Sequence, residues 1–499
     1  MVWSTMMKNK NHNYPFLVVL YMPTKRSQVL ALRHKLAFGV GQTAEGLKFN
    51  AFNTFLLFYY SQILGLSASI CGLAIFIALC VDAITDPIAG YLSDNTKSKW
   101  GRRHPYMFVS IIPLGISFYC LFNPPTGMTD NPLFIWLTVT AIGVRVSMTL
   151  FSIPHMSLGA ELSDDYVERS SIFGVSTFFG FFGGITCAAL GYLWFFKATP
   201  EQPNGLLNAA AYPDFGTTLA IGMMVAIALC AYGTLPLIKN LHTIDSQSNG
   251  PFLKSVFEGF LEAFRSSSFK VLFLGYVIMM CFFGTRDALL LYMATYFWEL
   301  TSLQISFYIG AYFVGMLTAV ALIKPISQIL DKKQILIFSS IIYFVLSSTP
   351  AVLRMLDLMP TNDSEFLLPL LVLFAWSASV NIILVMITVN SMLADIADEY
   401  ELKTGERREG IFYSARAFGV KASSGIGHLL AGFAIDVINF PKEAEPGTVA
   451  TSILNNLAIF DSVILSSVGI LSAFLFFNYR LTRRKHAYIQ AKLQGTDPT

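Results

Sequence analysis

Two aspartates lie one helical turn apart inside a long apolar stretch. Asp82 and Asp86 are four residues apart within the segment 70–92, and a helix places both carboxylates on one face at that spacing. A charged side chain inside a membrane helix costs about 2.5–3.5 kcal/mol, and two like charges this close hold a proton or a metal cation between them. Oxygen ligands suit a hard cation such as Na⁺. We therefore expect Asp82 and Asp86 to bind Na⁺ or H⁺, with the Thr85 hydroxyl as a further ligand. The alternative is an aspartate pair balanced by basic residues for folding alone.

A lysine lies deep inside another apolar stretch. Lys421 stands well inside the segment 411–437, and His428 follows two turns later on the same helix face. Lys421 is suited to pair with Asp82 or Asp86 and to hold or release the cation as parts of the protein move. Two interpretations remain open, namely a coupling residue and a structural ion pair.

Further polar residues in the apolar segments are candidates for binding a solute. They are Glu45, Asn53, Arg145, Ser152, His155 and His428. Each of them has the alternative of a hydrogen bond between helices. Glu45 and Lys48 are three residues apart, and the alternative for this pair is mutual neutralisation. Arg286 and Asp287 are another candidate pair of buried charges.

A short loop between two apolar segments carries charges of both signs. Asp94 ends one segment, and Arg102 and Arg103 precede the next. These residues are either a signal for membrane topology or a conformational gate that clamps helices by charge pairs in one transport state.

The segments that carry these residues predict an all-α integral membrane protein. The chain is 54% hydrophobic and only 13% charged, whereas about 25% charge is usual for a soluble protein. A membrane helix needs about 20 apolar residues. Segments of this kind lie at 36–64, 70–92, 106–123, 133–158, 172–196, 216–238, 268–298, 303–325, 334–353, 366–393, 411–437 and 457–478. The sequence therefore predicts twelve transmembrane helices.

The basic residues predict the orientation of these helices. They gather in alternate loops and in the C-terminal tail, including Lys97, Lys99, Lys332, Lys333, Lys403, Arg407, Arg408, Arg483 and Arg484. Because cytoplasmic loops carry the excess of Lys and Arg, we expect both termini to be cytoplasmic. We expect a multi-pass protein of the cell membrane, which is the inner membrane if the organism is a bacterium.

The chain repeats itself across its middle. The run at 160–165 resembles the run at 394–399 in residue type and order, and each is followed by an arginine. We predict an N-terminal extension at 1–34, a six-helix half at 35–238, a cytoplasmic linker at 239–267, a second half at 268–480 and a cytoplasmic tail at 481–499. Met22 is an alternative start of the native protein. Two six-helix halves are the architecture of the major facilitator superfamily, whose solute site lies between the halves.

Other functional classes have little support in the sequence. A net charge of +3 gives no reason to expect a nucleic-acid partner, and the six cysteines lie in apolar stretches without metal-type spacing. The sequence contains no glycine-rich phosphate loop and no nucleophile elbow. We therefore expect neither an enzyme nor a cofactor other than the coupling cation.

The run from Asp82 to Pro87, together with Gly90, Asp94 and the stretch 100–105, closely resembles the signature of the glycoside-pentoside-hexuronide:cation symporters. The stretch 403–421 resembles the region of the tenth and eleventh segments in that family. The resemblance implies symport with Na⁺, Li⁺ or H⁺, cation binding at Asp82, Asp86 and Thr149, and a role for Lys421 near that site. The sugar site departs from the pattern of melibiose permease. Gly46 and Ser152 stand in place of aspartates and Thr177 in place of an arginine, and Thr177 joins the solute-binding candidates.

These observations predict a monomeric secondary transporter that couples uptake of a sugar, glycoside or uronide to inward movement of a cation. One alternative is a cation-coupled carrier of a lysolipid or another amphiphile. Another is a membrane receptor that transports nothing.

Overall fold

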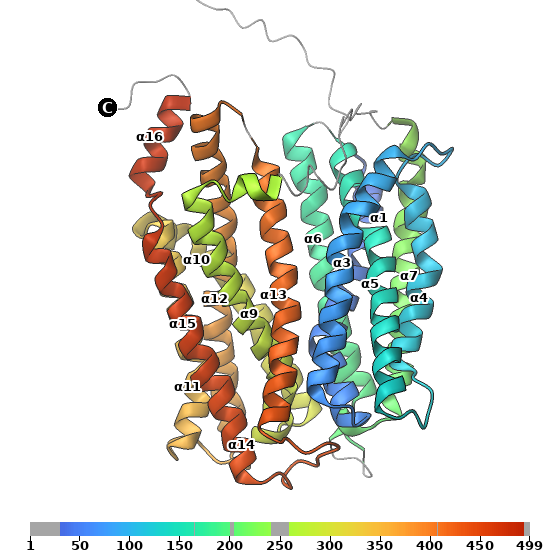
Figure 1. The fold of residues 1–499 in the computed structure, drawn as a ribbon, viewed down its shortest axis with the longest axis vertical. Coiled ribbons are helices and arrows are strands. Elements are labelled where there is room, and N and C mark those ends of the chain that lie inside the picture. The colour runs from blue at the N-terminus through green and yellow to red at the C-terminus, as the bar shows by residue number, and fades with distance from the viewer. Residues whose placement is uncertain (1–29, 164, 200–203, 241–258, 407, 494–499) are drawn as a thin grey trace, which may run out of the picture.

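The computed structural model describes residues 30–163, 165–199, 204–240, 259–406 and 408–493. These residues form long helices that stand side by side in two bundles (Figure 1). The predicted extension at 1–34 and linker at 239–267 lie largely outside the described residues.

The first bundle, which we call the N half, begins with a helix that is broken into short pieces. These are α1 (Leu32–Val40), α2 (Gln42–Asn50) and the π-helical turns η1 (Ala51–Leu56) and η2 (Tyr59–Ile63). The other helices are α3 (Ala68–Asn95), α4 (His104–Phe122), α5 (Asp130–Glu161), α6 (Tyr166–Ala189) with η3 (Leu190–Phe195), and α7 (Ala211–Thr234).

The second bundle, the C half, lies on the left of Figure 1. Its helices are α9 (Ser267–Tyr292) with η6 (Met293–Phe297), α10 (Ser302–Ile329), α11 (Lys332–Met355), α12 (Leu367–Thr404) and α13 (Glu409–Val437). The last long segment consists of α14 (Thr451–Ala458), η7 (Ile459–Ile464) and α15 (Leu465–Leu475), and the short helix α16 (Arg483–Leu493) follows it.

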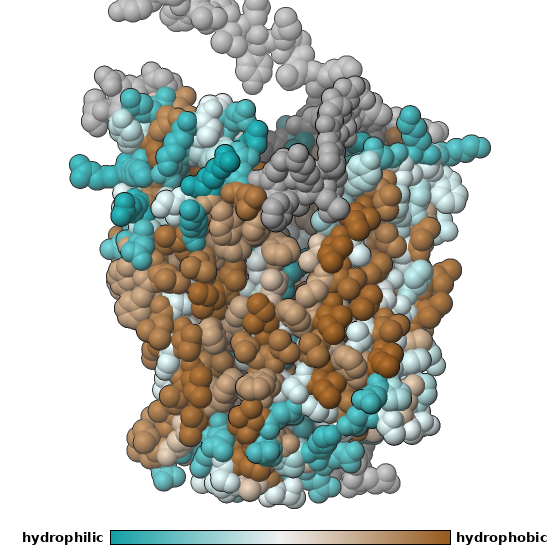
Figure 2. All heavy atoms as spheres, in the orientation of Figure 1, coloured by the Kyte–Doolittle hydropathy of each residue, from teal (hydrophilic) through white to brown (hydrophobic). Residues whose placement is uncertain are grey.

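Among the described residues, each of the twelve predicted segments coincides with a helical segment. Ten of the helices that the structure describes are long and apolar enough to cross a membrane. The other two segments are the broken first one and α13, which carries Arg416 and Lys421. Hydrophobic side chains cover the middle of the face shown in Figure 2, and hydrophilic side chains gather at its upper and lower ends. This is the surface of a multi-pass membrane protein.

The two ends of the molecule differ in their loops. One end, which we call the basic face, carries the loop between α3 and α4, the loop between α12 and α13, and α16; it is uppermost in Figure 1. The other end, the opposite face, carries the loops 64–67, 123–129 and 438–450.

The halves meet along α3 and α13, which run antiparallel. A Cβ atom on Gly72 would lie 2.6 Å from the His428 carbonyl oxygen, and one on Gly432 would lie 2.1 Å from that of Ala68. Small residues of this kind let the backbones of membrane helices approach closely. The close packing sets the register of the two helices and brings Lys421 level with the aspartates of α3.

Candidate functional site

Asp82 and Asp86 lie on the face of α3 that meets α5, where they share one hydroxyl group. The Thr149 Oγ1 atom lies 2.8 Å from Asp82 Oδ1 and 2.8 Å from Asp86 Oδ1. Asp82 is only 5% exposed. The two carboxylates and the hydroxyl therefore form one cluster of oxygen atoms, the group of ligands that a small hard cation prefers.

Lys421 reaches this cluster from the other half. Its Nζ atom lies 3.0 Å from Asp82 Oδ2 and forms a shorter ion pair with Asp86. The Lys421 side chain remains 41% exposed, and that of Asp86 20%. The lysine ammonium therefore lies between the two carboxylates, and the cluster is not fully enclosed by protein.

The Thr85 hydroxyl does not point into the oxygen cluster, where the sequence analysis expected it as a ligand. The hydroxyl donates to the carbonyl of Asp82 in its own helix (3.2 Å), so in this conformation it is not a ligand in the oxygen cluster. Pro87 has no N–H to bond the carbonyl of Ala83, which weakens the helix next to Asp86.

Arg145 also lies at the cluster. Its Nη1 atom is 3.5 Å from Asp82 Oδ2, and its guanidinium group lies over the ring of Phe52 at 5.2 Å. The sequence made Arg145 a candidate for binding the solute, whereas the structure places it against the Asp82 carboxylate of the oxygen cluster.

Glu45 and Lys48 form an ion pair of 2.6 Å, as the alternative reading of their spacing allowed. The second carboxylate oxygen of Glu45 is buried and has no hydrogen-bond partner among the described residues. Asn53 is buried in η1, and Ser152 is half-buried on α5, one turn from Met148 and close in sequence to Thr149. These residues remain candidates for the solute site.

His428 lies in the contact between α3 and α13. Its Nδ1 atom donates to the carbonyl of Ser424 (2.8 Å), and its buried Nε2 atom has no partner among the described residues. An unpaired polar atom in a buried position between the two halves is available to a bound solute. His428 therefore remains a candidate.

Two predicted solute residues lie outside this site. His155 donates from Nε2 to the Phe38 carbonyl (2.8 Å) and stacks on the Phe38 ring at 4.1 Å, so it packs α5 against α1. Thr177 is exposed on α6 and donates to the carbonyl of Phe173 in its own helix (2.9 Å). Sequence spacing alone did not show which side of each helix faces the other half.

Gly46 explains one departure from the sugar-binding pattern. A Cβ atom at this position would lie 2.0 Å from the Gly180 carbonyl oxygen and 2.8 Å from the Gly184 nitrogen. The position is filled by the contact of α2 with α6, and an aspartate has no room there.

The predicted gate residues form one cluster at the basic face. Asp94 pairs with Arg103 at 2.5 Å, and Arg102 and Arg103 both contact Glu161 at the end of α5, at 3.0 and 2.8 Å. In the C half, Lys332 pairs with Asp395 at 2.7 Å. Glu161 and Asp395 are the residues that the internal repeat aligns. Each cluster joins elements of a single half.

At the opposite face, by contrast, polar contacts join the two halves. The Tyr296 hydroxyl donates to Gln62 Oε1 at 3.0 Å, and Gln62 donates from Nε2 to the Pro441 carbonyl at 3.3 Å. Ser61 forms a short hydrogen bond with Tyr292. The molecule is therefore sealed between the halves at this face.

Asp436, at the end of α13, also joins the two halves at this face. The backbone N–H groups of Ala68 and Ser69 donate to its carboxylate at 3.2 and 2.9 Å. Ser67 at the start of α3 gives no side-chain cap to its own helix. A carboxylate of the C half thus caps a helix of the N half, a role that favours negative charge. The sequence showed an aspartate at the end of an apolar segment but nothing that identified its partner.

We expect Asp436→Ala to open the opposite face more often. A helix cap contributes about 0.5–2 kcal/mol, and about 1.4 kcal/mol changes an equilibrium tenfold. A single cysteine at Asn53, in a background without reactive native cysteines, should then react roughly 2–30 times faster with a charged thiol reagent applied at the opposite face. Lys442→Ala is the matched control, because its pair with Asp130 at the same face is exposed (3.8 Å) and such pairs contribute little. Equal rates in the two variants would contradict the capping role.

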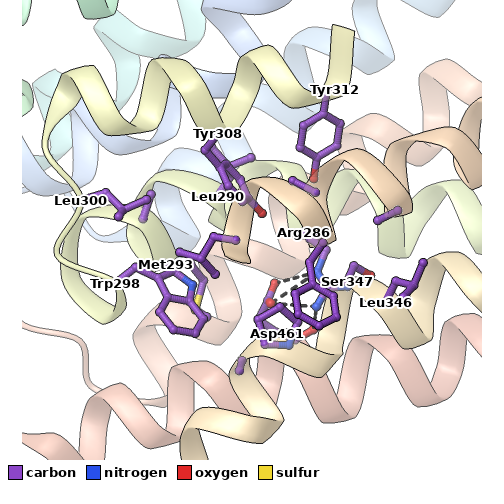
Figure 3. Close-up of a pocket in the computed structure, with 17 residues that line it drawn as sticks. Arg286, Leu290, Met293, Trp298, Leu300, Tyr308, Tyr312, Leu346, Ser347 and Asp461 are labelled. Atoms are coloured by element: carbon purple, nitrogen blue, oxygen red, sulfur yellow. Dashed lines mark hydrogen bonds and ion pairs between the residues drawn. The ribbon is translucent and has the colours of Figure 1, made fainter. Parts of the chain in front are cut away.

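A second buried ion pair lies inside the C half. Arg286 donates to the Asp461 carboxylate from Nε at 3.2 Å and from Nη2 at 2.8 Å, and also to the Asp461 carbonyl at 2.9 Å (Figure 3). The sequence suggested that Arg286 and the adjacent Asp287 form the pair of buried charges. In the structure, the ion pair of Arg286 is with Asp461. The cavity beside the pair measures about 60 Å³ and is lined by Tyr308, Tyr312 and Trp298 among others.

We expect this pair to stabilise the fold rather than to take part in transport. Asp461→Ala leaves Arg286 buried without its partner, which costs about 3–5 kcal/mol of unfolding free energy. The double variant Arg286→Met, Asp461→Leu should recover most of the loss, since a hydrophobic pair replaces a buried ion pair at little cost. Thermal unfolding of the purified proteins compares them. A stable Asp461→Ala protein that has lost cation coupling would contradict this assignment.

The described residues form twelve helical segments in two halves, which is the arrangement of a transporter of the major facilitator type, and comparisons with known proteins agree. The chain belongs to the family described as MFS/sugar transport protein, which matches residues 37–483. It is therefore a membrane transporter and not an enzyme.

Several proteins named as symporters, transporters or importers resemble this chain over most of their length. The inner membrane symporter YicJ of Escherichia coli is 22% identical over 414 residues, which cover 82% of this chain and 83% of the relative. The isoprimeverose transporter of Lactiplantibacillus pentosus is 24% identical and covers 82% of each chain. A putative sulfoquinovose importer of Escherichia coli is 23% identical over 92% of this chain and 93% of the relative.

Solved structures share the fold. A D-xylose-proton symporter superposes with a TM-score of 0.60 at 14% identity, over 90% of this chain and 97% of the other. The inward open xylose transporter XylE from E. coli gives 0.58 at 14% identity, over 92% of this chain and 98% of the other. The fold and the relatives establish a secondary transporter.

Proposed function

We propose that this protein is a symporter that couples uptake of a sugar, glycoside or uronide to a monovalent cation, Na⁺ or H⁺, bound between Asp82 and Asp86. The observation that carries the proposal is the oxygen cluster of Asp82, Asp86 and Thr149, with the Lys421 ammonium of the other half in the position of a cation. Relatives named as an isoprimeverose transporter and a putative sulfoquinovose importer support the solute class.

The mechanism follows from the different attachments of the two charges. The aspartates belong to the N half and Lys421 to the C half. When the halves move apart at this point, the carboxylates lose the ammonium group and bind a cation in its place. The cation then stabilises the conformation that binds the solute, which is coupling by differential affinity.

We assign the basic face to the cytoplasm, because its loops and α16 carry the clustered Lys and Arg residues. The seal at the opposite face then lies outside, and the structure represents a conformation open toward the cytoplasm. In this conformation Lys421 holds the aspartates after the cation has left. The charge clusters around Glu161 and Asp395 are proposed as gates that rearrange when the basic face closes.

Solute identity is tested on the purified protein and on vesicles. Isoprimeverose, glucuronides and sulfoquinovose are screened for protection against thermal unfolding in NaCl and in choline chloride, and at several pH values. We expect one class to protect, and to protect more strongly when the coupling cation is present. Protection by a lysophospholipid instead would shift the solute class to amphiphiles. Absence of any solute-dependent cation flux in proteoliposomes would contradict symport itself.

A further inference from the structure

Arg145 is buried against the cation site, where the proposed mechanism gives it no task. The residue is 8% exposed and stands one turn before Thr149 on α5. It faces Asp82 Oδ2, the same oxygen that lies 3.0 Å from Lys421 Nζ. Its Nε atom has no partner among the described residues. Asp82 is thus contacted by two cationic side chains.

These two cationic side chains are attached to different halves. Arg145 lies on α5, which packs along α3 within the N half, whereas Lys421 lies on α13 of the C half. Movement of one half against the other therefore separates Lys421 from the aspartates and leaves Arg145 with them. One countercharge is removable and the other is fixed.

The fixed charge determines how many cations the site needs. With Lys421 in place, the carboxylates of Asp82 and Asp86 are balanced by two positive charges. Without Lys421, a single negative charge remains, and one monovalent cation neutralises it. Lys48 also lies near Asp82, but its 2.6 Å pair with Glu45 is neutral as a unit and leaves this balance unchanged. A buried cluster that carries net charge is costly.

We propose that Arg145 is a fixed countercharge for Asp82 that makes the docking of Lys421 and the binding of the coupling cation mutually exclusive. The proposal rests on the cation-coupled symport proposed above. Without Arg145, the carboxylates would keep one negative charge while Lys421 is docked, and they would hold the lysine and a cation together. The return of Lys421 would then no longer expel the cation. Arg145 is therefore a positioning residue for coupling.

The test compares Arg145→Gln with the charge-conserving Arg145→Lys. Purified proteins are titrated with NaCl or LiCl against choline chloride at constant ionic strength, and separately with pH. The readout is the cation concentration that gives half of the thermal stabilisation. We expect Arg145→Lys to stay within about threefold of the wild type, and Arg145→Gln to need at least about tenfold less cation. Net uptake by Arg145→Gln in proteoliposomes should be at least about tenfold slower, because the cation is not expelled.

A double-mutant cycle with Lys421→Gln separates this role from a structural one. Removing the competing lysine should lower the half-effect concentration strongly in the wild-type background and hardly at all beside Arg145→Gln. If Arg145→Gln does not fold, Arg145→Met takes its place in the cycle, because it removes the charge and keeps a long side chain beside Asp82. The proposal is overturned if Lys421→Gln has the same effect in both backgrounds, or if Arg145→Lys lowers the half-effect concentration as much as the uncharged variant does. A wild-type protein without any cation response would instead contradict the symport.

Discussion

Asp86→Asn should abolish uphill accumulation of the solute and leave the folded protein in the membrane. Asp86 contacts Lys421 and Thr149 and is the more exposed of the two aspartates. One charge moved through 100 mV supplies about 2.3 kcal/mol, which is enough for roughly fiftyfold accumulation when about 1.4 kcal/mol corresponds to tenfold. Without the carboxylate charge this drive is lost, and the solute should only equilibrate across the membrane.

The measurement is the steady ratio of internal to external solute in proteoliposomes under an imposed cation gradient and potential. Thr85→Val is the matched control, since Thr85 lies on the same helix but donates to the Asp82 carbonyl rather than to the cluster. We expect the control to keep at least half of the wild-type ratio. Gradient-driven accumulation by both Asp82→Asn and Asp86→Asn would show that the cation site lies elsewhere.

Lys421→Gln should separate net uptake from exchange. The lysine is the charge that neutralises the empty site, since its Nζ atom contacts both carboxylates. Without it, release of the cation leaves uncompensated negative charge at a half-buried site, so the empty carrier returns slowly. Net uptake should fall at least about tenfold, while exchange of external for internal solute, which needs no empty carrier, should stay within about threefold of the wild type.

Lys421→Arg keeps the charge and serves as the control for loss of side-chain packing. We expect it to retain more net uptake than Lys421→Gln. Equal loss of net uptake and exchange in Lys421→Gln would indicate a structural ion pair, which is the alternative that the sequence left open.

The main features of the fold and the charged cluster in its interior could be predicted because each follows from one strong physical constraint. Hydrocarbon thickness fixes the length of apolar segments, so helices such as α3 and α11 begin and end close to their predicted limits. Asp82 and Asp86 were recognisable because two acids one turn apart are costly in a membrane helix. Lys421 was recognisable for the same reason.

The remaining contacts depend on which helix faces which, and one sequence does not contain that information directly. Asp436 caps α3 from the other half, and Arg286 finds Asp461 far along the chain. His155 and Arg145 lie on the same helix, yet one packs against Phe38 and the other against Asp82. For such contacts, the sequence offers only the requirement that buried charges be neutralised. A buried Arg286 therefore requires an acidic partner, and Asp461 is that partner in the structure.

The most direct test of the central claim is cation flux driven by solute. Proteoliposomes with wild-type protein receive the solute on one side with no cation gradient, and Na⁺ or H⁺ movement is recorded. We predict that solute flowing down its gradient carries the cation with it, and that Asp86→Asn passes the solute with no cation. Equal cation movement in the two proteins, or none in the wild type while solute flows, would contradict a coupling ion held between Asp82 and Asp86.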